Sequence, residues 1–194
     1  LSITDNTRYL NFWATHGGSP SLGSRSNHSF QIITNDSVRM TLDTSGGVYV
    51  NDTTNANMTV GLTINQGAAD DQIFCLKSSD VAHGALGLVA GTVETDDFFT
   101  ISKENATDGG VAINCIQENG SESRVLDLWI AGGQASTTKT TSGYGLMSVF
   151  VTEHDGSNAR ANITANGNVF TINAYVGGAF ATRFLVDEDG DLYS

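Results

Sequence analysis

A glycine-centred turn between two short apolar runs occurs twice in the chain in nearly the same form, and it limits the possible folds more than any other feature. The two copies are VRMTLDTSGGVYV (residues 38–50) and TRFLVDEDGDLYS (residues 182–194). Apolar and polar residues alternate before each turn, which is the period of a β-strand, and a second apolar run follows the glycine. Each copy therefore predicts a β-hairpin.

The two copies agree residue by residue. The identical pairs are Arg39 and Arg183, Asp43 and Asp187, Gly46 and Gly190, and Tyr49 and Tyr193; the apolar pairs are Met40 and Phe184, Leu42 and Val186, and Val48 and Leu192. A weaker third copy is RANITANGNVF (residues 160–170), whose Asn166-Gly167 predicts a tight hairpin turn with φ > 0 at both positions. A fragment, TRYL (residues 7–10), resembles the start of the second copy, so we expect the chain to open partway through a copy.

The rest of the chain has the same alternating pattern, which predicts an all-β fold. Glycine is frequent, with 22 residues, proline occurs once, and no stretch has a helical period with caps. We expect roughly a dozen short antiparallel strands. The alternating runs outside the repeats are HSFQIIT, MTVGLTIN, QIFCLK, DDFFTISK, GGVAINCI, RVLDLWIA and GLMSVFVT.

The repeats also divide the chain into three predicted regions. Residues 1–65 form an N-terminal hairpin-repeat region, residues 66–155 a central β-sandwich-like region, and residues 156–194 a C-terminal region with two hairpin copies. We expect Cys75, Cys115 and Trp129 in the core of the central region. Each cysteine lies in an apolar alternating run, which favours a buried thiol and leaves a disulfide open. Residues 131–143 are polar and predict an exposed loop.

Charge and hydropathy argue against two classes of partner. The net charge is −12, and nine Lys and Arg against 21 Asp and Glu cannot neutralise many phosphates, so we expect no nucleic-acid binding. No apolar run of 18 residues exists, so we expect no membrane insertion. The first residue is Leu1 and no signal-peptide pattern follows it, so we expect a processed product or a piece of a longer protein.

The repeated unit resembles a repeat of phage tail fibre proteins. In that family a TNG-like turn, an Arg-rich strand, an Asp-Ser-Ser-Gly-Asn turn and a Val-x-Ile strand recur along a shaft, and residues 34–50 (TNDSVRMTLDTSGGVYV) follow this order. FLVDEDGDLYS (residues 184–194) resembles a hairpin of tail-fibre and virion proteins of environmental phages. The family's Gly-Ile-Gly-Thr continuation is replaced by residues 49–52. The resemblance implies an elongated homotrimer on the virion, outside the cell, that positions receptor-binding tips.

The acidic run of the second copy is a candidate calcium site, through Asp187, Asp189 and Asp191. Calcium takes six to eight oxygen ligands, and a tight loop of carboxylates can supply several of them. The order differs from an EF-hand, and the first copy carries Ser45 and Gly47 where the second carries Asp189 and Asp191. The third copy carries Asn166 and Asn168 at these positions, so only the turn is common to all three copies. We therefore favour a hairpin turn without metal, and we expect no cofactor.

Catalysis is the weaker alternative. The four histidines are scattered, and neither a Gly-x-Ser-x-Gly nor an HExxH motif occurs. A glycosidase needs two carboxylates across a cleft, and the available acids are expected at strand ends and turns instead. The histidines are His16, His28, His83 and His154, and the acids are Glu94, Asp96, Asp97, Glu118 and Glu122. We therefore predict that the chain is not an enzyme.

Binding of a host-surface glycan without catalysis would use aromatic side chains beside flexible loops. Trp13, Tyr144 and Tyr175 lie next to glycine-rich stretches and are the candidates. Burial of such rings in a core is the commoner case, so the ligand stays open.

Three functions are thus open. The first is a segment of a virion fibre that assembles with itself, as a trimer, contacts other virion proteins and supports host attachment. The second is a subunit of an extracellular filament or adhesin outside the phages that polymerises. The third is a polysaccharide-active tail enzyme. Short hairpins cannot cover both faces and all edges alone, which favours the first two.

Overall fold

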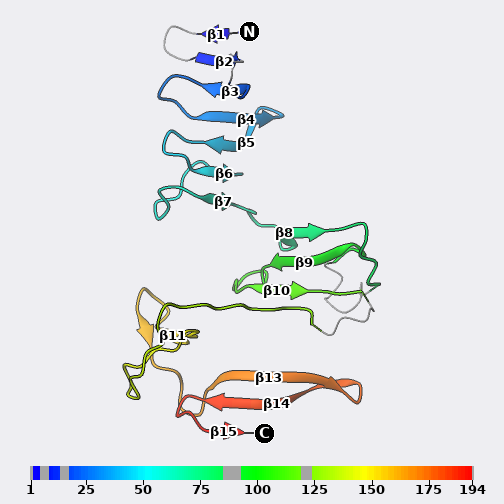
Figure 1. Cartoon of the computed structure of the whole chain (residues 1–194), viewed down its shortest axis with the longest axis vertical. Coiled ribbons are helices and arrows are strands. Elements are labelled where there is room, and N and C mark those ends of the chain that lie inside the picture. Colours follow the sequence, from blue (N-terminus) through cyan, green and yellow to red (C-terminus); the bar gives the residue numbers. More distant parts are fainter. Residues whose placement is uncertain (1, 5–8, 14–17, 85–92, 119–123, 194) are drawn as a thin grey trace. The chain divides into compact units, whose positions relative to one another are not determined.

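The chain is all-β in the computed structural model, which describes residues 2–4, 9–13, 18–84, 93–118 and 124–193, with side chains from Gly18 onward. The described residues form fifteen strands in five small sheets and contain no helix (Figure 1). Neighbouring strands are antiparallel except for one parallel pair. The chain divides into two units, residues 1–127 and 128–194. This boundary falls inside the region predicted as central.

Three sheets form the first unit. One sheet has the order β1-β2-β3, the next β4-β5-β6-β7, and the third β10-β9-β8. Their strands are β1 (Ser2–Thr4), β2 (Tyr9–Trp13), β3 (Ser21–Ser24), β4 (Phe30–Thr34), β5 (Ser37–Leu42), β6 (Val48–Val50), β7 (Leu62–Ile64), β8 (Gln72–Lys77), β9 (Asp97–Ser102) and β10 (Ala112–Cys115). Five alternating runs of the sequence thus form strands as predicted, in β4, β7, β8, β9 and β10.

Two sheets form the second unit. β11 (Glu153–His154) pairs with β12 (Arg160–Ala161), and β13 (Asn168–Val176) pairs with β14 (Ala179–Asp187), which also pairs with β15 (Leu192–Tyr193). Two predicted strands, RVLDLWIA and GLMSVFVT, are wrong for the single chain, because residues 124–152 contain no strand. The predicted loop over residues 131–143 is confirmed as exposed and irregular.

Two hairpins close with two-residue turns; the first is in the stretch that resembles the TNG-like turn of tail fibre proteins, and the second was not predicted. β4 and β5 are joined by Asn35 and Asp36, whose φ angles are 50° and 53°. β13 and β14 are joined by Gly177 and Gly178, with φ of 67° and 90°. Positive φ at both positions matches the twist of an antiparallel pair. A two-residue signal between alternating runs was present in both stretches.

Burial in the single chain is the reverse of the usual pattern. Among the described side chains, the buried apolar residues are Tyr49 and Val93, whereas the buried polar ones are Thr41, Asp97, Thr100, Ser102 and Asp187. Trp129 is 89% exposed, so the prediction that it lies in a core is wrong for the single chain. Apolar side chains normally fill the interior of a folded chain, so this distribution is unusual. No helix in the described part of the chain has the length and hydropathy of a membrane span.

Candidate assembly interface

The sheet β4-β5-β6-β7 has one face made entirely of apolar residues. Residues paired across strands lie on the same face, so the register gives two rows over the four strands. The first row is Phe30, Leu42, Val48 and Leu62, and the second is Ile32, Met40, Val50 and Ile64. Leu42, Ile32 and Leu62 are 38%, 46% and 57% exposed. The other five residues of the face are half-buried.

The opposite face of the same sheet is polar, and the chain's own loop covers it. Thr41 and Tyr49 on this face are each 2% exposed. The loop between β6 and β7 folds back there, because Asn55 Nδ2 donates to Thr63 Oγ1 at 3.0 Å, and the Thr63 hydroxyl contacts Met58 Sδ at 3.7 Å. The connection therefore shields the polar face and leaves the apolar face open.

The sheet β10-β9-β8 repeats this arrangement. Its register places six apolar side chains on one face, with Phe74 and Phe99 in edge-to-face contact at 6.3 Å. The polar face contains the buried Thr100 and Ser102. The six residues of the apolar face are Phe74, Leu76, Phe99, Ile101, Ile113 and Cys115.

The sheet β13-β14-β15 is the third example and the largest. One face is apolar along its whole length, and it includes Ile172, which is 51% exposed, and an edge-to-face pair between Phe170 and Phe184 at 6.1 Å. Its residues are Phe170, Ile172, Ala174, Val176, Ala179, Ala181, Phe184, Val186 and Leu192. We call these three surfaces the apolar faces.

The accessible surface of the chain is larger than that of a folded monomer of the same mass. The chain exposes 15095 Å² at a mass of 20.4 kDa. A folded monomer of this mass would expose about 8,800 Å². The difference between these two areas is about 6,300 Å². Burial of several interfaces of about 800 Å² per partner would be needed to remove this difference.

The glycine-centred turns of the two main copies share most of their hydrogen bonds. In the first, Asp43 Oδ1 accepts from the amides of Ser45 and Gly47 at 2.9 and 2.7 Å, and Asp43 Oδ2 accepts from the Tyr49 hydroxyl at 2.9 Å. The amide of Gly46 donates to the Asp43 carbonyl at 3.3 Å. We call this arrangement the Asp–Tyr turn.

The second copy forms the Asp–Tyr turn with the corresponding atoms. Asp187 Oδ1 accepts from the Asp191 amide at 2.9 Å, and Asp187 Oδ2 accepts from the Tyr193 hydroxyl at 3.2 Å. The Gly190 amide donates to the Asp187 carbonyl at 3.1 Å. The sequence reading aligned these residues but missed the bond between them; the fixed spacing of six from Asp to Tyr was the available signal.

The turn shifts the pKa of its acid and phenol in opposite directions. The amide of Gly47 is the main cause that holds the pKa of Asp43 below its ordinary value, because it stabilises the carboxylate. The hydrogen bond to Asp43 raises the pKa of Tyr49, and the charge of Asp187 raises the pKa of Tyr193, because ionisation would place two negative charges together. The first turn therefore favours ionised Asp43 and neutral Tyr49.

The third copy forms a turn but no hairpin, so that prediction is wrong. Arg160–Ala161 pairs with β11, whereas Asn168 begins a strand that pairs with β14. Asn166 has φ of 60°, but Gly167 has no positive φ. Thr164 replaces the acid of the other copies, and its amide and hydroxyl donate to the Glu153 carboxylate at 2.8 and 3.1 Å. The third turn has no acid of its own, and the Glu153 carboxylate of β11 accepts the hydrogen bonds of Thr164 instead.

The acidic run predicted as a possible calcium site is built into the second Asp–Tyr turn. Both carboxylate oxygens of Asp187 accept hydrogen bonds from the protein, and Asp187 is 7% exposed. Asp189 and Asp191 are exposed side chains on the turn. The structure thus gives Asp187 a role in the turn, and the favoured interpretation, a hairpin turn without metal, stays a prediction.

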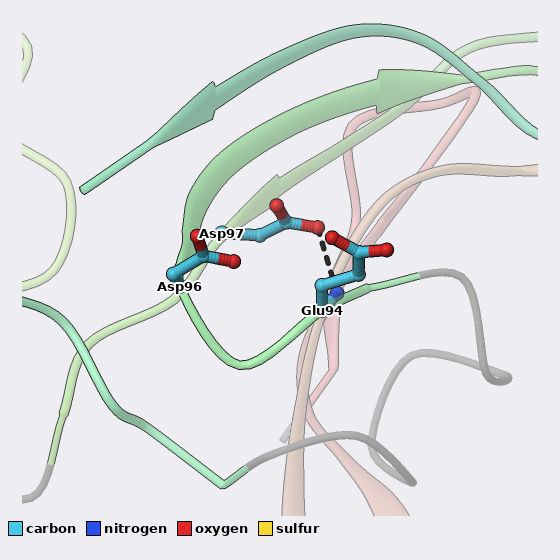
Figure 2. Close-up of side chains that lie close together, drawn as sticks. All are labelled: Glu94, Asp96 and Asp97. Carbon is cyan, nitrogen blue, oxygen red and sulfur yellow. Dashed lines mark hydrogen bonds between the residues drawn. The ribbon is translucent and has the colours of Figure 1, made fainter. Parts of the chain in front are cut away.

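A second acidic group, Glu94, Asp96 and Asp97, gathers ahead of β9, and Figure 2 shows the three carboxylates facing one region. The Lys77 ammonium binds Glu94 and lies 3.2 Å from Asp96 and 3.5 Å from Asp97, so it holds the position that a cation would take. Hydrogen bonds with Glu94 and Asp96 raise the pKa of Lys77. The group is an ion-pair cluster that fastens the start of β9.

Asp97 is the buried member of this cluster. Burial opposes its charge, but hydrogen bonds from Cys75 Sγ at 3.0 Å, Gln72 Nε2 at 2.9 Å and the Glu94 amide at 2.8 Å hold its pKa well below the ordinary value. Burial and the bond to Asp97 raise the pKa of the Cys75 thiol to about 11. Cys75 is therefore a structural hydrogen-bond donor and a poor nucleophile.

The two cysteines are free and half-buried, where the sequence predicted buried thiols. Cys75 pairs with Thr100 and Cys115 with Phe99, which are consecutive residues of β9. Consecutive residues point to opposite faces, so the two thiols lie on opposite sides of the sheet and cannot form a disulfide with each other. Cys115 lies on the apolar face.

Two of the candidate glycan-binding aromatics have described side chains, and each contacts a different phenylalanine. Tyr144 is 62% exposed and contacts Phe150 at 5.9 Å, whereas Tyr175 is 66% exposed and contacts Phe180 at 5.2 Å. The Tyr175 hydroxyl donates to the Gly178 carbonyl at 3.0 Å and so braces the hairpin turn. The side chain of Trp13 lies outside the described residues. Glycan binding stays a prediction.

The candidate catalytic groups have structural or solvent contacts. Glu94 binds Lys77, Glu118 is exposed, and His154 Nδ1 accepts from the Gly156 amide at 3.0 Å. His16 and Glu122 lie outside the described residues. Comparisons of the chain with protein-family models, curated protein sequences and solved structures gave no match.

Proposed function

We propose that the chain is a structural segment of a virion fibre, similar to tail fibres, that assembles with copies of itself and supports host attachment without catalysis. The observation that carries the proposal is the reversed burial: three sheets each leave an all-apolar face uncovered while polar residues fill the chain's own interior. Copies of the same chain offer matching apolar faces, so association would bury all three at once.

Three copies are proposed because of the resemblance to tail fibre proteins, in the repeat at residues 34–50 and in the second copy. In such an assembly each apolar face meets the equivalent faces of its partners, and the predicted central sandwich is completed between chains. The polar faces and the acidic turns stay outside, where the net charge of −12 keeps separate assemblies apart. Contacts with other virion proteins and a host glycan belong to the same proposal.

Light scattering over a wide concentration range tests the assembly. We expect a mass of three times 20.4 kDa that does not grow with concentration. Growth without limit would favour the extracellular filament subunit instead. A lone monomer at every concentration would exclude both.

A matched pair of variants tests the surface itself. Ile32 and Gln31 are consecutive exposed residues of β4, with Ile32 on the apolar face and Gln31 on the polar one. Ile32→Glu would place a charge in the interface and should dissociate the assembly, whereas Gln31→Glu should leave the mass unchanged. Ile172→Glu and Thr171→Glu form the equivalent pair on β13. Equal behaviour within both pairs would contradict the proposed interface.

A further inference from the structure

Residues 124–152 contain two segments with strand-forming sequences and no strand partner. The segments are VLDLWIA (residues 125–131) and GLMSVFVT (residues 145–152). Over the whole stretch the single backbone hydrogen bond among the described residues runs from the Gly143 amide to the Thr140 carbonyl. Both segments are rich in β-branched and aromatic residues, whose preference is for a paired strand.

The side chains of both segments are exposed on both faces. In an extended chain Leu126, Leu128 and Ile130 point one way, and Val125 and Trp129 the other. Strands that are apolar on both faces are typical of sheets buried on both sides. The large apolar residues, each at least 44% exposed, are Val125, Leu126, Leu128, Trp129, Ile130, Leu146, Met147, Val149, Phe150 and Val151.

The charge of the stretch indicates what would cover it. Residues 125–152 contain two charged side chains, Asp127 in the first segment and Lys139 in the loop, in a chain whose net charge is −12. A partner of opposite charge would find few charges to pair with here, whereas copies of a stretch with so few charges repel one another little. The surface that remains to be buried is also larger than one standard interface requires.

The two segments do not already form a ladder with each other. They approach where a Cβ added to Gly132 would lie 2.6 Å from Leu146 Cδ2, which is a side-chain contact with the backbone of a neighbouring segment. No backbone hydrogen bond joins the segments at this point. Their amides and carbonyls are therefore available to another strand.

We propose that residues 125–131 and 145–152 pair as strands with the same segments of neighbouring copies, and so form an interchain β-sheet inside the assembly. This inference rests on the proposed self-assembly. It adds that the chains are held together by backbone hydrogen bonds between strands as well as by burial of the apolar faces. Residues 132–144 would remain a loop outside the sheet.

Hydrogen exchange of the assembled full chain tests the pairing. Amides of residues 125–131 and 145–152 should exchange at least about a hundredfold more slowly than those of residues 133–142, which serve as the internal control. Fast exchange in both segments of a confirmed trimer would overturn this inference alone. A monomer in light scattering would overturn the proposed function as well, so the two failures are distinguishable.

Pairing within one chain is separated from pairing between chains by two further measurements. Protection that persists in the dissociated Ile32→Glu chain would overturn the interchain sheet. Val149→Pro removes one amide donor from the second segment and should abolish protection there, while Ala135→Pro in the loop should not. In a Trp13→Phe background the emission of Trp129 should move to shorter wavelength on assembly; emission of a solvent-exposed indole in the trimer would contradict the inference.

Discussion

The Asp–Tyr turn at residues 43–49 and the turn at residues 164–170 share a glycine and their apolar positions, but only the first leads into a hairpin. In the first, one carboxylate binds two turn amides and the tyrosine of the returning strand. In the other, Thr and Phe replace Asp and Tyr together, and the strands on either side join different sheets. The glycine permits the turn, and the Asp–Tyr pair ties the returning strand to it.

Removal of Asp43 should have the largest effect on the melting temperature. Asp43→Ala deletes the acceptor of three hydrogen bonds and leaves the hydroxyl of Tyr49, which is 2% exposed, without a partner. We expect the melting temperature to fall by about 8 °C. Thr164→Ala, which removes one exposed side-chain bond, should lower it by about 1 °C. Circular dichroism measures both, and Asp189→Ala is the control; equal losses at positions 43 and 164 would contradict the comparison.

The glycines of the two turns should respond differently to asparagine. Gly46 has φ of +96°, with ordinary contact distances around an added Cβ, and asparagine tolerates positive φ better than other residues. At Gly167 an added Cβ would lie 2.6 Å from the Thr164 carbonyl oxygen and 2.8 Å from Ile163 Cγ2. We expect Gly167→Asn to lower the melting temperature by about 5 °C and Gly46→Asn by about 2 °C. A larger loss for Gly46→Asn than for Gly167→Asn would contradict the reasons given, which are the positive φ at Gly46 and the close contacts at Gly167.

Placing an acid in the third turn should fail to create an Asp–Tyr turn. Thr164→Asp brings a carboxylate beside Glu153, whose oxygens now accept from Thr164. We expect repulsion to lower the melting temperature by about 3 °C, and the double change Thr164→Asp with Phe170→Tyr should not restore it. Thr164→Ser keeps the hydroxyl and is the control. A stabilised double variant would show that the pair alone builds the hairpin.

The hydroxyl of Tyr49 should have the smallest effect, and it should depend on pH. Because the folded pKa of Tyr49 is raised, its contribution to stability is present below pH 10 and is lost as pH rises through the folded pKa. Because the folded pKa of Asp43 is lowered, its contribution is present above pH 4 and is lost as pH falls. Tyr49→Phe should cost about 2 °C at pH 7 and flatten the alkaline limb of a melting-temperature profile. An unchanged alkaline limb would contradict the role given to the phenol.

The sequence predicted the strand class and several strands because alternation with a period of two is a local property. β4, β8, β9 and β10 follow directly from their apolar runs. The segments at residues 125–131 and 145–152 have the same local pattern but form no strand, because a strand also needs a partner that the pattern does not name. The turn at Asn166-Gly167 failed for a related reason, since strand pairing on each side is decided by distant residues.

The contacts of the Asp–Tyr turns and of the Lys77 cluster were harder to predict from the sequence than the strands. The alignment of Asp43 with Asp187 and Tyr49 with Tyr193 was visible, but the bond between acid and phenol required the turn geometry. Lys77 was not connected to the acids at residues 94–97, since 17 residues separate it from Glu94. The all-apolar faces could be read in principle, because each combines the inward positions of strands whose register the hairpin turns fix.

The Asp–Tyr turn also has a consequence for the order of folding. Its contacts span six residues, so it closes by a short search within one chain, and its rate does not depend on protein concentration. Burial of the apolar faces between copies would need collisions, and that step would speed up as concentration rises. In a newly made chain the hairpins would thus form before the apolar faces are buried between copies. Dilution during refolding would slow this burial and would leave the rate of turn formation unchanged.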